Sequence, residues 1–216
     1  MTITLYYGSG SPYAWKVQLA LEHKALPYER KVLSFDAGDT RKPDFLAVNP
    51  RGRVPTIDDD GYVIYESNAI VEYLEDAYPG RGEALFPGDA KQRGIVRRLV
   101  AEVDNYVYTA VDKILDHSSI KPEARDAAAL EAARAAVSEE LRLYTRSFRG
   151  PYLAGPLSAA DFALYPYVAF LFRVQQKRIP ALRAEALLTP ELAAWRERIE
   201  ALPYFARTYP PHWGQP

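Results

Sequence analysis

Short apolar runs separated by turn residues dominate the first third of the chain. Residues 3–7 (Ile-Thr-Leu-Tyr-Tyr) predict a strand that ends at a run of glycine and serine. Ser11 followed by Pro12 predicts the N-cap and first residue of a helix, which continues with apolar residues at helical spacing. Residues 28–33 (Tyr-Glu-Arg-Lys-Val-Leu) predict a second strand. These elements indicate a β-α-β unit with a right-handed crossover.

A β-hairpin and a helix are predicted next. The apolar runs 54–57 and 62–65 flank an Asp/Gly turn at 58–61. Ser67 then predicts the N-cap of a helix whose apolar face has a period of 3.6 residues. The first 80 residues therefore predict the order βαβ, loop, ββα, with a mixed four-stranded sheet.

Beyond a linker rich in glycine and proline, at 79–88, the apolar period becomes helical and stays so. The segments predicted as helices are 93–115, 122–148, 158–174 and 190–201, and the tail 209–216 is expected to be irregular. We therefore expect an α/β domain at 1–80 and an all-α domain at 90–216.

The composition is that of a globular protein, and it excludes several kinds of chemistry. The 216 residues carry a formal net charge of −1, so no bulk charge favours nucleic acid or an anionic membrane. The first residues lack the features of a signal peptide, and no apolar run reaches the length of a membrane span, which predicts a cytoplasmic protein. Without cysteine the chain has no disulfide and no thiol nucleophile, and its three scattered histidines favour no metal site.

Four motifs carry a resemblance to a known family. They are Ser11-Pro-Tyr-Ala-Trp-Lys-Val17, Asn49-Pro-Arg-Gly-Arg-Val-Pro55, Glu66-Ser-Asn-Ala-Ile70 and Gly155-Pro-Leu-Ser-Ala-Ala-Asp161. In this order and spacing the chain resembles the cytosolic glutathione S-transferase superfamily over nearly its whole length. The resemblance implies that a thioredoxin-like domain (1–80) binds glutathione and that the helical domain (90–216) holds an apolar co-substrate.

The resemblance assigns the ends of glutathione to named residues. A cis bond before Pro55 would turn the backbone of Val54 toward the cysteinyl segment, which it would pair as a strand edge pairs a peptide. A trans proline that ends a loop is the alternative. Glu66 and Ser67 would bind the ammonium and carboxylate of the γ-glutamyl end, because helix N-termini favour carboxylates. This role is compatible with Ser67 also capping the helix.

The second carboxylate of glutathione, at its glycyl end, calls for a cation. The candidates are Arg53, which matches a family position usually held by Gln or Lys, and Arg41 and Lys42, for which a solvated surface role is the alternative. Asp104 matches an acid that in the family reaches across a homodimer to the γ-glutamyl amine, and a solvated acid is again the alternative.

Ser11 is the predicted catalytic residue. A free thiol has a pKa of about 8.5, so a hydroxyl that donates a hydrogen bond to the sulfur at a helix N-terminus would favour the thiolate. Ser11 matches the active serine of theta- and zeta-like members, and Ser9 and Tyr7 are the alternative hydroxyls. A chain without cysteine cannot form the mixed disulfides of omega- and beta-like members, and the zeta-like isomerase motif matches only in part.

The remaining candidates concern the co-substrate and the fold. Tyr13, Tyr106, Tyr108 and Phe170 could line the apolar co-substrate site, with a core role as the alternative for each. The sequence Ser158-x-x-Asp161 is a variant of the capping box, to which we assign a structural role.

The predicted function is glutathione S-conjugation or a related glutathione-dependent reaction. Glutathione is then a co-substrate and no cofactor is expected. The implied partners are glutathione and a small apolar electrophile, in a cytoplasmic homodimer with a role in detoxification. The alternative is a non-catalytic regulatory or protein-interaction module on the same fold. The identity of the electrophile and the class within the superfamily stay open.

Overall fold

The computed structural model describes residues 2–214. Their contacts divide the chain into two compact units: residues up to Phe86 together with those from Pro203 onward, and Pro87–Leu202. The sequence led us to expect residues 203–216 with the helical region, so the structure differs from the expected boundaries at this end. Each unit is described by itself.

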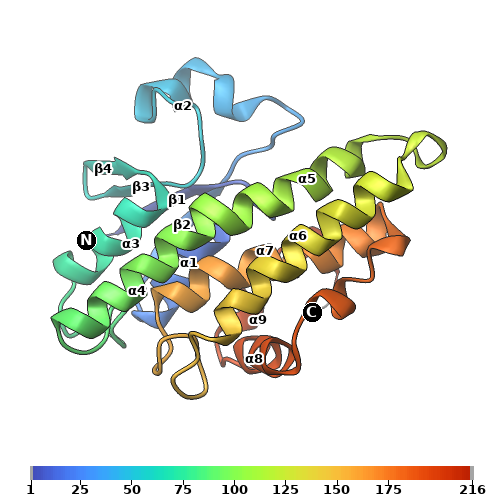
Figure 1. Cartoon of the computed structure of the whole chain (residues 1–216). Helices are drawn as coiled ribbons and strands as arrows, with labels where there is room; N and C mark the ends of the chain where they lie inside the picture. Colours follow the sequence, from blue (N-terminus) through green and yellow to red (C-terminus); the bar gives the residue numbers. More distant parts are fainter. Residues whose placement is uncertain (1, 215–216) are drawn as a thin grey trace. The chain divides into compact units, whose positions relative to one another are not determined.

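The first unit is built on a sheet whose strands, within the described residues, are β1 (Ile3–Tyr7), β2 (Tyr28–Val32), β3 (Thr56–Asp59) and β4 (Tyr62–Tyr65) (Figure 1). Their order in the sheet is β2-β1-β3-β4. The pair β1–β2 is parallel, whereas β3 is antiparallel to both of its neighbours. This confirms the predicted mixed four-stranded sheet and its thioredoxin-like order of elements.

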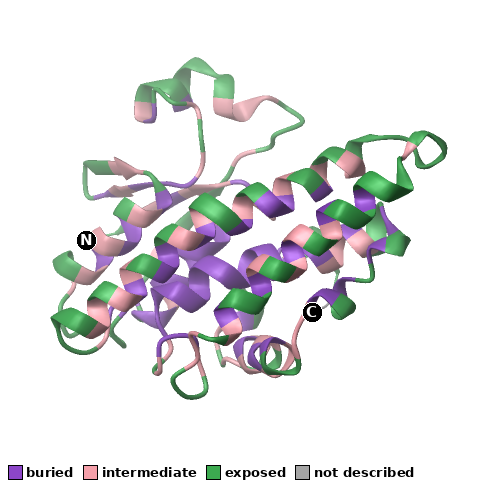
Figure 2. Ribbon diagram, in the orientation of Figure 1, coloured by how far each residue is buried: buried purple, intermediate pink, exposed green. Residues whose placement is uncertain are grey.

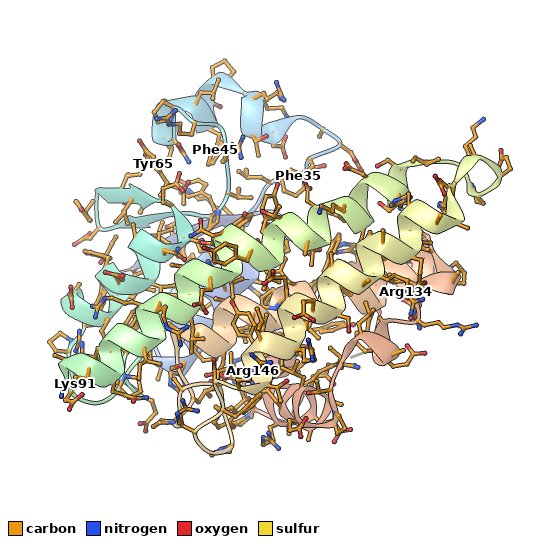
Figure 3. All side chains as sticks on the ribbon, viewed as in Figure 1. Phe35, Phe45, Tyr65, Lys91, Arg134 and Arg146 are labelled. Carbon is orange, nitrogen blue, oxygen red and sulfur yellow. The ribbon has the colours of Figure 1, made fainter. Side chains whose placement is uncertain are left out.

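Helices α1 (Pro12–His23) and α3 (Ser67–Ala77) lie on one side of this sheet and α2 (Pro43–Val48) on the other (Figure 1). Residues alternate between the two faces of a strand. On β1, Leu5 is fully buried, whereas the ring of Tyr6 lies 5.7 Å from that of Phe45. Phe45 belongs to α2 and is labelled in Figure 3. The sequence did not predict α2, because its six residues bury only Phe45 and so show no helical period.

The C-terminal segment belongs to the first unit because it packs along α1. It contains the short helix α9 (Phe205–Thr208) and a 3-10 turn at Pro211–Trp213, where the sequence predicted an irregular tail; residues 215 and 216 lie outside the described residues. Its anchor is Trp15, which is 1% exposed. The indole nitrogen of Trp15 donates to the hydroxyl of Thr208 at 2.9 Å.

The second unit is helical. Its α-helices are α4 (Ala90–Glu102), α5 (Tyr108–Ser119), α6 (Ala127–Thr145), α7 (Ala159–Lys177) and α8 (Pro190–Glu200). A π-helical segment (Val103–Val107) joins α4 to α5, so the helix predicted at 93–115 is continuous but contains a π turn. Helix α7 is buried over most of its length, from Ala159 to Ala169, and forms the core of this unit (Figure 2). Within residues 2–214 no helix combines the length and apolarity that crossing a membrane requires.

A buried capping box begins α7. Ser158 is its N-cap, and the Asp161 side chain accepts hydrogen bonds from the backbone N–H and hydroxyl of Ser158, at 2.9 and 3.1 Å. It also accepts from the Leu153 N–H at 3.0 Å and from the Trp195 indole at 2.9 Å. Burial raises the pKa of Asp161 to about 6, against the effect of these donors. The predicted structural role of this motif is confirmed.

We expect Asp161→Ala to lower the free energy of unfolding by about 3 kcal/mol, because it leaves several buried donors without an acceptor. Asp126→Ala is the matched control. Asp126 is also an N-cap aspartate, of α6, but it is exposed, so its loss should cost about 1 kcal/mol. Urea denaturation measures both values, and equal losses would contradict the role assigned to the buried network.

His23, at the end of α1, should make the first unit sensitive to acid. Burial lowers its pKa from 6.5 to about 4, although the nearby Glu83 opposes this shift. A histidine with a lowered pKa stabilises the fold above its unfolded pKa, and this contribution is lost as the pH falls from 6.5 toward 4. At pH 5 the loss should be about 2 kcal/mol.

The measurement compares the wild type with His23→Gln at pH 7 and pH 5 by chemical denaturation. The fall in stability between the two pH values should be about 2 kcal/mol smaller in the variant. Asp161, whose raised pKa acts in the opposite direction, is present in both proteins and cancels in the comparison. Identical pH dependence in the two proteins would show that His23 does not carry the effect.

Candidate functional site

The strand register brings the predicted site segments of the first unit to one end of the sheet. Thr56, the first residue of β3, pairs with Tyr6 near the end of β1 and with Tyr65 at the end of β4. The loop that follows β1, the Val54-Pro55 pair that precedes β3 and the Glu66-Ser67 pair that follows β4 therefore emerge at this same end.

The peptide bond between Val54 and Pro55 is cis, as predicted. Asn49, which is 1% exposed, stabilises the loop between α2 and β3 through buried hydrogen bonds. Its side-chain amide donates to the Arg53 carbonyl and to the Thr56 hydroxyl, both at 2.9 Å. Asn49 therefore fixes Arg53 and Thr56, the residues on either side of the Val54-Pro55 pair. Val54 itself is half-buried.

The backbone conformation and close surroundings of Gly52 explain why this motif has glycine at that position. Its φ is +59°, and a Cβ built there would lie 2.7 Å from the Thr40 carbonyl oxygen. Any side chain at this position would displace the backbone that leads to the cis proline.

Ser11 occupies the predicted N-cap of α1, with Pro12 at the first helical position. Its backbone N–H donates to the Gly8 carbonyl at 3.0 Å, and its hydroxyl oxygen accepts from the Ala14 N–H at 3.5 Å. The cap uses the hydroxyl only as an acceptor, so the hydroxyl proton can still be donated to a ligand. The side chain is half-buried, at the positive end of the helix dipole.

The alternative hydroxyls lie close by. Tyr7 is the last residue of β1, pairs with Val32 and is half-buried. The Ser9 hydroxyl lies 3.0 Å from Nδ1 of His212 in the C-terminal segment.

The start of α3 differs from the prediction. Ser67 is the first residue of the helix, and Glu66 occupies the N-cap position with a φ of +71°. The prediction that Ser67 caps this helix was therefore wrong. The Ser67 hydroxyl is buried and bonded to Lys16 instead, while Glu66 is exposed at the turn.

Lys16 is the site residue to which the sequence analysis gave no role. It is 1% exposed, and its ammonium donates to the Ser67 hydroxyl at 3.1 Å and to the Asn68 side-chain oxygen at 2.7 Å. A buried positive charge thus lies beside the N-terminus of α3, where the helix dipole also attracts anions. A signal was present in the sequence, because Lys16 interrupts an apolar helical run.

The three cationic candidates all lie at the surface, and one of them forms an ion pair. Arg53 and Arg41 are exposed. Lys42 is also exposed, and its ammonium lies 2.6 Å from a carboxylate oxygen of Asp39. Arg53 directly precedes the cis pair, so it remains the first candidate of the three for a contact with the glycyl carboxylate.

Asp104 and most of the predicted aromatic residues belong to the second unit. Asp104 is half-buried in the π-helical segment. Tyr106 is exposed and lines a cavity of about 510 Å³. The other residues that line it are Arg98, Glu102, Glu140, Leu143, Tyr144, Arg146, Ser147 and Arg149. Figure 3 labels one of them, Arg146. This cavity is charged rather than apolar, and Tyr108 and Phe170 are not among its lining residues.

The other aromatic candidates are each half-buried. The Tyr108 ring lies 6.3 Å from that of Tyr167, and Phe170 is half-buried. In the first unit, Tyr13 is half-buried on α1 with the Lys16 ammonium 5.6 Å from its ring centre. A shared apolar site for these residues stays a prediction. Among residues 2–214, no three histidine or acidic side chains are grouped as a metal site would require.

Comparison with known proteins identifies the family. Residues 10–77 match the N-terminal domain of glutathione S-transferases, and residues 108–203 match their C-terminal domain. The chain is 30% identical to glutathione S-transferase A of Pleuronectes platessa, over 98% of this chain and 92% of that protein. It is 34% identical to a probable glutathione S-transferase of Oryza sativa subsp. japonica, over 88% and 81% of the respective chains.

Solved structures agree with this result. A glutathione S-transferase from the Antarctic clam Laternula elliptica superposes with a TM-score of 0.83 and 29% identity, covering 100% of this chain and 95% of the clam protein. Glutathione transferase Omega 3C from Trametes versicolor gives a TM-score of 0.80 and 28% identity, over 96% and 89% of the respective chains. With both domains matched and full-length relatives at this level of identity, the chain belongs to the glutathione S-transferase family.

Proposed function

We propose that this transferase binds glutathione at the end of the sheet described above and that Ser11 stabilises its thiolate for attack on an apolar electrophile. The observation that carries the proposal is the placement of Ser11. Its half-buried hydroxyl caps α1 as an acceptor, keeps its proton for a ligand, and emerges at the same end of the sheet as the cis Val54-Pro55 pair. A thiolate placed there would receive a hydrogen bond at a helix N-terminus, and both favour the ionised form.

The rest of glutathione extends over the neighbouring segments. The backbone of Val54 pairs with the cysteinyl residue as one strand pairs with another. The γ-glutamyl carboxylate lies at the N-terminus of α3, where it accepts from the Ser67 hydroxyl close to the Lys16 ammonium. Glu66 binds the γ-glutamyl ammonium and Arg53 the glycyl carboxylate, with Arg41 and Lys42 as further cations near that end.

The reaction needs no nucleophile from the protein. The glutathione thiol loses its proton to solvent, the thiolate attacks the electrophilic atom, and a carbon–sulfur bond forms as the leaving group departs with its electron pair. Binding both reactants side by side supplies much of the rate. Since the chain contains no cysteine, it forms no mixed disulfide with glutathione. This favours a serine-active, theta- or zeta-like member.

The finer assignments rest on the family resemblance. Tyr13, Tyr106, Tyr108 and Phe170 are the residues proposed to hold the apolar co-substrate. We also propose a homodimer, in which Asp104 of one protomer reaches the γ-glutamyl amine bound by its partner. Light scattering at micromolar concentration tests the dimer.

Removal of the Ser11 hydroxyl should lower turnover far more than glutathione affinity. A hydrogen bond to a charged sulfur contributes about 1.5–3 kcal/mol, so we expect kcat to fall by about tenfold or more and the pKa of the bound thiol to rise. Ser11→Gly is the preferred variant, because glycine also caps helices and keeps α1 stable to within a few tenths of a kcal/mol. The measurements are kcat with an activated aryl halide and the ultraviolet absorbance of the thiolate in the binary complex.

Ser11→Thr retains the hydroxyl and should restore most of the activity. The alternative hydroxyls are tested by Ser9→Ala and Tyr7→Phe under the same conditions. A larger loss in either of these than in Ser11→Gly would transfer the activating role. The proposal of a glutathione enzyme itself is tested by thermal melting with millimolar glutathione, which should raise the midpoint.

Lys16→Met should weaken glutathione binding by about tenfold, because a charge-assisted network at the carboxylate site is lost. The KM for glutathione should rise more than kcat falls. Lys91→Met, at an exposed lysine of α4, is the control and should leave KM unchanged (Figure 3). Lys16→Arg keeps the charge, so it should bind glutathione better than Lys16→Met even if both variants lose stability. Equal KM values for these two variants would contradict an electrostatic role.

A further inference from the structure

The C-terminal segment contacts the loop that carries the activating serine. The Ser9 hydroxyl and Nδ1 of His212 are 3.0 Å apart, although 203 residues separate them in sequence. Ser9 lies two residues before Ser11, in the turn closed by the bond from the Ser11 N–H to the Gly8 carbonyl. One end of the chain is thus bonded to the turn that presents the proposed catalytic hydroxyl at the other end.

The contact belongs to a segment anchored along the whole of α1. At the end of α1, the hydroxyl of Tyr204 lies 2.9 Å from Nδ1 of His23. At the neighbouring residue of α1, the Glu22 carboxylate lies 2.6 Å from the Arg207 guanidinium. The segment then passes Trp15 and reaches the loop before α1, so it runs antiparallel to the helix. His212 is therefore held at the loop by a chain of contacts and does not approach it alone.

The backbone of the loop leaves room for this segment. Gly10 has a φ of +83°, and a Cβ built there would lie 3.0 Å from the Trp213 indole nitrogen and 3.2 Å from the imidazole of His212. The Trp213 ring in turn lies 5.5 Å from that of Trp15, edge to face, and is 8% exposed. Because Gly10 has no side chain, the C-terminal segment can pack directly against the turn between Ser9 and Ser11.

We propose that His212 is a positioning residue for thiolate activation: through its hydrogen bond to Ser9 it fixes the turn Gly8–Ser11, and with it the direction of the Ser11 hydroxyl. The inference rests on the proposed role of Ser11. His212 does not touch the sulfur. It restricts the turn, so that the Ser11 hydroxyl points at the place where the thiolate forms and spends little time in unproductive orientations.

The position of the Ser9–His212 contact lets an effect on thiolate activation be told apart from an effect on glutathione binding. Glutathione is proposed to bind through Val54, Ser67 and Lys16, whereas the His212 imidazole contacts Ser9, in the turn before α1. Loosening the turn should therefore reduce kcat and raise the pKa of the bound thiol, while the KM for glutathione changes little. A loss of global stability alone would leave both quantities unchanged in the folded enzyme.

The experiment compares His212→Ala, His212→Asn and Ser9→Ala in the full chain, with Arg207→Gln as the control. A single neutral hydrogen bond corresponds to a roughly three- to tenfold fall in kcat for His212→Ala. His212→Asn places an amide near the position of Nδ1 and should recover most of this loss. Arg207→Gln weakens the same segment at the far end of α1 and should keep the wild-type kcat and thiol pKa.

A double-mutant cycle completes the test. Ser9→Ala combined with His212→Ala should lower kcat no further than either change alone, because both remove the same hydrogen bond. Wild-type kcat and thiol pKa in His212→Ala, or additive effects in the cycle, would overturn the inference. Ser11→Gly measured in parallel separates the outcomes: if it raises the thiol pKa and His212→Ala does not, only the role of His212 fails. Absence of any glutathione-induced rise in melting temperature would overturn both proposals.

Discussion

The antiparallel pairing of β3 with both of its neighbours is the constraint on which the site depends. Thr56 faces Tyr6 on one side and Tyr65 on the other, so the residues just outside these three positions must emerge together. A shift of register by one residue would move the Val54-Pro55 pair by one strand position and turn alternate side chains to the opposite face. The buried Asn49 protects this register, because it bonds to both Arg53 and Thr56.

The same topology concentrates positive potential at that end of the sheet. Helix α1 begins soon after β1 ends and α3 begins directly after β4, so two helix N-termini follow strands that end there. The buried Lys16 adds a full charge beside Ser67, at a desolvation cost that a ligand carboxylate would offset. Electrostatics that attract a carboxylate at one helix and favour a thiolate at the other suit a ligand such as glutathione, which carries both groups.

Local patterns predicted most of the elements of this site. The strand at 3–7, the Ser11-Pro12 helix start and the hairpin each follow from residues close in sequence, and the structure confirms them. The cis bond before Pro55 is instead what the family resemblance implies, and the structure has it. The departures have a different origin. Helix α2 is too short to show a period. The Ser67 hydroxyl accepts a hydrogen bond from Lys16, 51 residues earlier in the chain, and does not cap α3. Pairings between distant segments leave no periodic trace in one sequence.

The C-terminal segment is the largest such departure, and its cause is the burial of Trp15. Motif Ser11–Val17 places this indole one turn inside α1, where its N–H needs an acceptor and its ring needs apolar cover. Thr208 supplies the acceptor, and the rings of Phe205, Tyr209 and Trp213 supply the cover, at 5.5–6.1 Å between ring centres. A segment that meets these needs must run along α1, and that path leads His212 to Ser9. The packing of one core tryptophan thus brings the end of the chain to the turn that presents Ser11.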